Sequence, residues 1–175
     1  AVREGKKLKG LTMRLRKLSD DDWVDVLDNL REVRLLARED NGGTHSANGV
    51  AQPLDCHPLV REYFGERLKK ERRKSWKAAH ARLYEYFKSL PKKDLPDTIE
   101  EMGPLFQAVL HGCHAGKYQE SLEEIYYQRI QREKVFYSTR MLGVVGACVS
   151  SLGGFFDSPW RRPVQDSLSG TKAFS

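Results

Sequence analysis

His57 is the residue whose surroundings most favour binding chemistry. It stands between Cys56 and Pro58, where an alternating apolar–polar segment gives way to a helical pattern. An imidazole N–H can donate a hydrogen bond to a phosphate oxygen, and the start of a helix attracts anions. His57 is therefore a candidate phosphate sensor, with helix capping as its simpler role. Direct activation of Cys56 by His57 is not expected, because neighbouring residues of a strand point to opposite faces.

A second group of possible ligands, His111, Cys113 and His114, lies within one predicted helix. Zinc requires three or four ligands at suitable spacing, and the sequence contains no second cluster to complete such a set. We therefore expect no metal site. His111 is expected to pack against a neighbouring helix, and His114 to lie at a helix end, where a positive charge is favourable.

The motifs of nucleotide hydrolysis are absent from the sequence. It contains no GxxxxGK[ST] segment, whose backbone and lysine would bind phosphates. The pairs Gly42–Gly43 and Gly153–Gly154 are interpreted as turns. The chain alone is therefore expected to be no enzyme and to hold no cofactor.

Composition places the chain among globular proteins. It has 175 residues, of which 39% are hydrophobic and 31% charged, with a net charge of +6. No apolar run approaches the roughly 20 residues that a membrane span needs. The three cysteines are far apart in sequence, and no signal peptide is visible, which favours free thiols and a cytoplasmic location. We interpret the basic excess as a solvated helical surface.

The first part of the chain predicts a small helix–hairpin–helix unit. Ser19 is a good N-cap, and the acidic residues after it favour a helix over 19–32. Short strands are predicted over 33–38 and 50–55, joined by a glycine-rich turn. A helix then follows over 58–68, with proline at its first position. This order is typical of a winged-helix domain, which we place at residues 1–72.

The second part predicts an antiparallel helical arm over 73–160. Apolar residues recur at helical spacing from residue 75, again after Thr98, over 118–130 and over 138–152. A tight turn is predicted at 114–117, with glycine free to adopt a positive φ. Residues 161–175 are expected to form a flexible tail. The predicted fold is thus mostly α.

Residues 54–62, with the sequence LDCHPLVRE, resemble the methionine–histidine–aspartate motif of signal-transducing ATPases with numerous domains, the NB-ARC and NACHT class. The helix at 18–32 and the sequence RLL at 34–36 also resemble the winged-helix domain of that class. Residues 102–160 resemble the helical region that follows it in large bacterial members with tetratricopeptide repeats. Within them, 105–126 is similar to one such repeat.

The resemblance implies a regulatory role for His57, which would contact the β-phosphate of ADP and stabilise a closed, inactive state. Cys56 stands where the family often has methionine, and Pro58 where plant members have aspartate. ADP or ATP would be bound mainly by a nucleotide-binding domain upstream of this chain. The helical arm would bind a protein partner, and its candidate contact residues are the aromatics Tyr84, Tyr127 and Phe156, expected to be exposed.

Two alternative functions remain open. A DNA-binding winged helix would need a basic recognition helix and a basic wing, whereas Asp20, Asp21, Asp22, Asp25 and Asp28 make this helix acidic. The predicted wing, residues 39–49, has no lysine or arginine. Nucleic acid is therefore not an expected partner, and the lack of a long apolar run argues against a membrane as well. The third reading is a stand-alone helical scaffold with no link to nucleotide.

Overall fold

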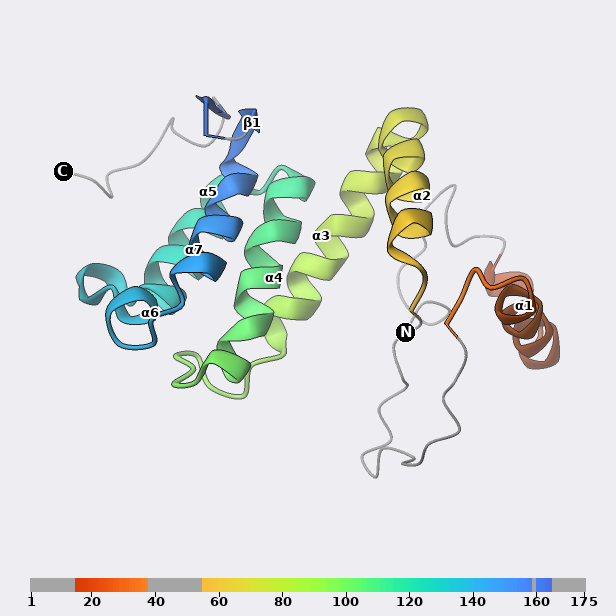
Figure 1. Ribbon diagram of the computed structural model, residues 1–175, viewed down its shortest axis with the longest axis horizontal. Helices are drawn as coiled ribbons and strands as arrows, with labels where there is room; N and C mark the ends of the chain where they lie inside the picture. The colour runs from red at the N-terminus through yellow and green to blue at the C-terminus, as the bar shows by residue number, and fades with distance from the viewer. Residues whose placement is uncertain (1–14, 38–54, 159, 165–175) are drawn as a thin grey trace. The chain divides into compact units, whose positions relative to one another are not determined.

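The chain is mostly helical in this computed structural model, which describes residues 15–37, 55–158 and 160–164 (Figure 1). The predicted helical class is confirmed, and within those residues one small antiparallel sheet of two strands accompanies the helices. The chain divides into two compact units, Ala1–Ser75 and Trp76–Ser175.

The first unit begins with a 3-10 turn, η1 (Leu15–Lys17), followed by helix α1 (Asp20–Glu32). Ser19 Oγ accepts a hydrogen bond from Asp22 N, and the Asp22 carboxylate accepts one from Ser19 N, both at 3.1 Å. Each side chain thus satisfies an amide that the helix leaves unpaired. Hydrogen bonds from the Ser19 hydroxyl and backbone hold the pKa of Asp22 below its ordinary value. The predicted helix start is confirmed.

The segment after α1 is a turn where the sequence predicts a strand. Arg34 has a φ of 59°, and the amides of Leu35 and Leu36 both donate to Leu30 O, at 2.9 and 3.1 Å. The extended backbone therefore starts later than residue 33. A single antiparallel bridge joins Leu36 to Cys56. The rest of the predicted hairpin, including its tip, lies outside the described residues.

Helix α2 (Pro58–Glu71) begins at the predicted proline. It contains no buried residue, and neither does α1. Three of its large side chains are strongly exposed: Leu59 at 67%, Tyr63 at 61% and Phe64 at 53%. Tyr63 and Phe64 contact each other edge to face, with ring centroids 5.2 Å apart.

The second unit is a helical array that ends in a small hairpin. Its first two helices are α3 (Arg73–Ser89) and α4 (Ile99–Ala115), of which α3 starts just before the unit boundary. The remaining elements are α5 (Tyr118–Glu120), η2 (Ser121–Ile130), η3 (Glu133–Val135), α6 (Tyr137–Arg140), α7 (Val145–Leu152), η4 (Gly153–Phe155), β1 (Phe156–Ser158) and β2 (Arg162–Pro163).

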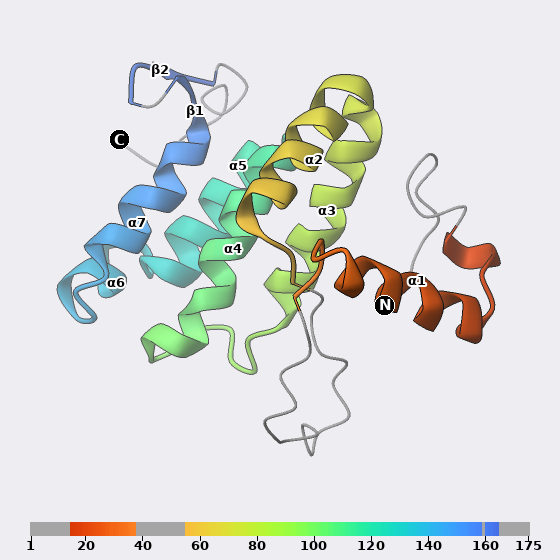
Figure 2. The same cartoon turned by 45° about the vertical axis from the view of Figure 1, so that its right-hand side comes forward.

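The core of this unit is built around α4. This helix runs beside α3 in both views (Figure 1 and Figure 2) and contacts η2, α7 and η4. It supplies much of the buried apolar cluster, whose members are Tyr84, Met102, Leu105, Ala108, Val109, Cys113, Ile125, Ile130 and Phe155. Thr98 caps α4 as predicted, accepting from Glu101 N at 3.2 Å. At its end Gly116 has a φ of 85°, as its turn position requires.

Residues 118–130 form a helix as predicted, but most of this helix is a π-helix rather than an α-helix. Tyr118–Glu120 forms one α-turn, after which η2 makes hydrogen bonds to the fifth residue back, as in Gln131 N to Tyr126 O at 2.9 Å. Its buried residues Ser121, Ile125 and Ile130 are spaced by four and five. The wider π-turn keeps such a spacing on one face, which an α-helix would not.

One prediction for the C-terminal part was wrong. The helix predicted over 138–152 is divided into α6 and α7 by a turn in which Gly143 has a φ of 68°. The segment predicted as a flexible tail, residues 161–175, contains a short paired strand near its start, and its residues 165–175 lie outside the described part of the chain. β1 and β2 are antiparallel, and Val164 N donates to Phe155 O at 2.9 Å.

Candidate functional site

His57 caps the start of α2. Its Nδ1 accepts a hydrogen bond from Leu59 N at 3.3 Å, and its backbone carbonyl accepts from Val60 N and Arg61 N at 2.9 and 3.1 Å. Pro58 follows at the first helical position, where its missing N–H costs nothing. The simpler of the two predicted roles, capping, is therefore present.

Capping leaves the other ring nitrogen of His57 available. A neutral imidazole carries one proton, and because Nδ1 accepts the bond from Leu59 N, that proton lies on Nε2. The side chain is exposed. His57 can thus cap the helix through Nδ1 and donate to an anion through Nε2 at the same time. The two roles considered for this residue are compatible.

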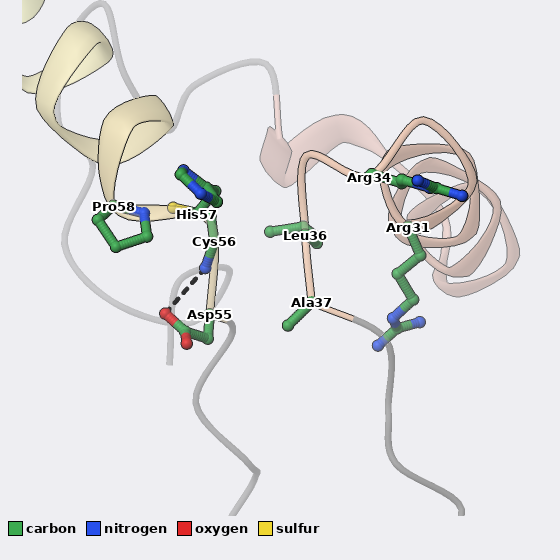
Figure 3. Close-up of a pocket in the computed structure, with 8 residues that line it drawn as sticks. All are labelled: Arg31, Arg34, Leu36, Ala37, Asp55, Cys56, His57 and Pro58. Carbon is green, nitrogen blue, oxygen red and sulfur yellow. Dashed lines mark hydrogen bonds between the residues drawn. The ribbon is translucent and has the colours of Figure 1, made fainter.

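A pocket of about 460 Å³ opens beside His57 (Figure 3). It lies between the end of α1 and the start of α2, with the bridged segments forming its wall. Its lining residues are Arg31, Arg34, Leu36, Ala37, Asp55, Cys56, His57 and Pro58. Figure 3 shows the two arginines on the α1 side and His57 with Pro58 on the α2 side.

The charges around this pocket are partly compensated. Arg31 forms an ion pair with Asp28 at 2.9 Å, and Arg61 forms one with Asp55 at 2.8 Å. Arg34 is exposed and has no ion pair with any of the described residues. The pocket is therefore lined by an arginine and a histidine, two residue types that can donate to an anionic oxygen.

A third histidine, which was not expected from the sequence pattern, joins His111 and His114. His80 of α3 lies against both: its ring centroid is 5.0 Å from that of His111 and 4.8 Å from that of His114. Cys113 does not belong to this group, since it is buried in the core, where burial raises the pKa of its thiol to about 12. Among the described residues, no three His, Cys, Asp or Glu side chains are arranged to hold a metal ion.

The three aromatic candidates for partner contact differ in exposure. Tyr84 is fully buried, so the expectation that it is exposed was wrong. It packs in the α4 core because Gly112 and Ser121 leave room for its ring. Tyr127 and Phe156 are half-buried, and Phe156 contacts Trp160 with ring centroids 5.1 Å apart.

The buried hydroxyl of Tyr84 has no hydrogen-bond partner among the described residues. We expect Tyr84→Phe to raise the free energy of unfolding by about 1 kcal/mol, because a desolvated and unpaired hydroxyl is removed. Tyr126→Phe is the matched control, since Tyr126 Oη accepts from Gln131 Nε2 at 3.0 Å. That variant should lose about 1 kcal/mol. Urea denaturation measures both, and equal losses in the two variants would contradict the expectation.

Comparison of the chain with family models, curated proteins and solved structures gave no match. Among the described residues, no single helix combines the length and apolar character needed to cross a membrane. Two helical segments, Glu133–Arg140 and Val145–Phe155, are bent by 120° relative to each other. They meet that test only when they are taken together.

Proposed function

We propose that this chain is a regulatory and protein-interaction part of a multidomain signal-transducing NTPase, of the NB-ARC and NACHT class. In this proposal residues 1–72 are a winged-helix domain that packs on an upstream nucleotide-binding domain. Residues 73–160 are a tetratricopeptide-like arm that binds a protein partner. The chain itself catalyses nothing, ADP or ATP is held mainly upstream, and the protein acts in the cytoplasm.

The order of elements supports the winged-helix assignment. A capped helix, α1, leads to a backbone bridge between Leu36 and Cys56, and α2 starts immediately after that bridge. The exposed apolar side chains of α2, Leu59, Tyr63 and Phe64, fit a unit that packs on another domain.

The tetratricopeptide-like assignment is supported by the α4–α5–η2 hairpin. Its turn places Gly116 in the left-handed conformation, and Lys117 N donates to Gly112 O at 2.9 Å. Ser121 and Gly112 are both buried where the two arms of the hairpin approach closely. Small residues at the crossing of two antiparallel helices are what such repeats require.

The observation that carries the proposal is the hydrogen bond from Leu59 N to His57 Nδ1. It fixes the imidazole at the start of α2 and directs the remaining proton to Nε2. A phosphate oxygen of ADP would accept from Nε2–H, with Arg34 of the same pocket as a source of positive charge. Loss of this contact would favour the open, active state.

The test uses His57→Ala and His57→Ser in a protein that carries this chain together with its upstream sequence. Serine can still cap the helix, but it cannot reach the phosphate. Both variants should retain ADP about ten- to a hundredfold less tightly, as expected for one lost charge-assisted hydrogen bond. Basal activity should rise in both. If His57→Ser retains ADP as the wild type does, His57 is only a cap. The sequence upstream of Ala1 must also contain a phosphate-binding loop.

The other two functions predict different results. A DNA-binding winged helix would shift duplex DNA in a salt-dependent manner. In the structure Asp20, Asp21, Asp25 and Asp28 of α1 are exposed, and such a surface repels phosphate. A stand-alone scaffold would have no phosphate-binding loop upstream and would show no response to nucleotide.

A further inference from the structure

Three histidines meet between α3 and α4, outside the pocket at His57. His80 comes from α3, and His111 and His114 come from α4. Nδ1 of His80 lies 2.9 Å from Nδ1 of His111, a hydrogen-bond distance. We name His80, His111 and His114 the histidine cluster.

Aromatic side chains cover this cluster. Trp76, one turn before His80 on α3, lies edge-on to His80 with ring centroids 4.3 Å apart, and to His114 at 5.2 Å. Phe87 stacks on His111 at 5.3 Å. The first half of α3 thus contacts α4 through imidazole rings and the indole that lies against them.

The contact between His80 and His111 depends on how many protons the two imidazole rings carry. Of two Nδ1 atoms that share a hydrogen bond, one must carry a proton and the other must offer its lone pair. If both rings are protonated, two N–H groups face each other across 2.9 Å and the bond becomes a repulsion. The contact therefore exists only while at least one of the two rings is neutral.

Within the described residues, the charges that shift the pKa values of His80 and His111 come from other imidazoles. The groups that act on His80 are the imidazoles of His114 and His111, and the group that acts on His111 is His114. On the α3 side the neighbouring charge is Lys77, whose ammonium lies beside Gly116 just after α4.

We propose that the histidine cluster is an acid-sensitive lock, which holds the first half of α3 on α4 at neutral pH and releases it when the imidazoles become protonated. The released segment begins at Trp76, the residue at which the second unit starts. Acidification would therefore free the stretch of chain that connects the two units.

The direction of the pH effect follows from the pKa values. Burial, together with a smaller effect of positive charge on His114 and His111, lowers the pKa of His80 to about 4. Burial likewise lowers the pKa of His111 to about 4. An unfolded histidine takes up its proton near 6.5. Stability is therefore full above pH 6.5, is lost as the pH falls from 6.5 to 4, and changes no further below 4 on account of these groups.

The first experiment follows thermal or urea unfolding of the whole chain at pH 7 and pH 5. In the wild type, the ratio of unfolded to folded protein should rise by about twentyfold for each of the two histidines between pH 7 and pH 5. In the double variant His80→Asn/His111→Asn this rise should disappear, because an amide can occupy the position of Nδ1 without titrating. His57→Asn removes a histidine outside the cluster and should keep the full rise. An unchanged rise in the double variant overturns the proposal.

The second experiment keeps the histidines and so does not depend on the folding of a cluster variant. Trp23→Phe/Trp160→Phe leaves Trp76 as the single tryptophan of the chain. Protonated imidazole quenches a neighbouring indole, so Trp76 fluorescence should titrate with a midpoint well below 6.5. A midpoint near 6.5, or no titration between pH 7 and pH 4, overturns the proposal.

Discussion

Gly112→Ala is expected to lower the free energy of unfolding by about 2 kcal/mol or more. A Cβ at this position would collide with Ser121 Oγ and would lie 2.9 Å from Tyr84 Cδ2 and 3.1 Å from Ser121 Cβ. Both neighbours are fully buried. Ser121 Oγ donates to Lys117 O at 2.6 Å, so it cannot move without losing that bond. Chemical denaturation of the wild type and the variant measures the loss.

Gly103→Ala is the matched control for this substitution. It lies on the same helix, and nothing is found within 4 Å of the position of its Cβ. Alanine there should raise the free energy of unfolding by about 0.5–1 kcal/mol through helix propensity alone. Adding Ser121→Gly to Gly112→Ala should recover part of the lost stability. If both glycine variants are stabilised, α4 and η2 do not approach each other as closely as the structure shows.

The parts of the fold that the sequence predicted correctly are determined by neighbouring residues. Ser19 and Thr98 cap α1 and α4, Pro58 opens α2, and Gly116 closes α4. Each of these signals acts over about four residues, since it satisfies amides and carbonyls that a helix end leaves unpaired. Periodicity and capping therefore suffice to place the ends of such helices.

The sequence-based predictions were wrong where contacts between residues far apart in the sequence override the local preference for a helix or a loop. Residues 138–152 are all compatible with one helix, yet the chain turns at Gly143 so that Ser138 and Cys148, 3.2 Å apart, are both buried. β1 forms because β2 returns beside it, which the aromatic composition of 155–160 does not reveal. Tyr84 follows His80 by four residues and so lies on the same face of α3, and the gap at Gly112 leaves room for its ring.

The two candidate sites differ in how far the sequence could predict them. His57 lies at the junction between the bridged segment and α2, and the local pattern predicted that place. The availability of its Nε2–H and the position of Arg34 in the same pocket depend on the folded structure, which a sequence pattern does not show. His80 and His111 are 31 residues apart, so their contact was not visible in the sequence. A histidine at core spacing on each of two adjacent helices was the available signal.

Arg132→Gly is expected to lower the free energy of unfolding by about 2–3 kcal/mol. The Arg132 guanidinium donates to Pro96 O at 2.7 Å and to Asp97 Oδ1 at 3.0 Å. It also lies 3.5 Å from the ring centroid of Tyr137. Charge-assisted hydrogen bonds contribute about 1.5–3 kcal/mol, and a partly desolvated cation–π contact about 1–2. This one side chain thus ties the loop before α4 to the segment after η2.

The left-handed backbone at Arg132 costs free energy, which offsets part of the stabilisation from these contacts. A substitution at the neighbouring Glu133 separates the backbone effect from the side-chain effect. Arg132 has a φ of 52°, and Glu133 has a φ of 57° in the same turn. Left-handed backbone costs an L-residue roughly 1–2 kcal/mol, and glycine avoids that cost. Glu133 is exposed, so Glu133→Gly should leave the free energy of unfolding unchanged or raise it by about 1 kcal/mol. Denaturation that shows equal losses for both variants would mean that the turn, rather than the guanidinium, determines stability here. A loss confined to Arg132→Gly assigns it to the contacts with Pro96, Asp97 and Tyr137.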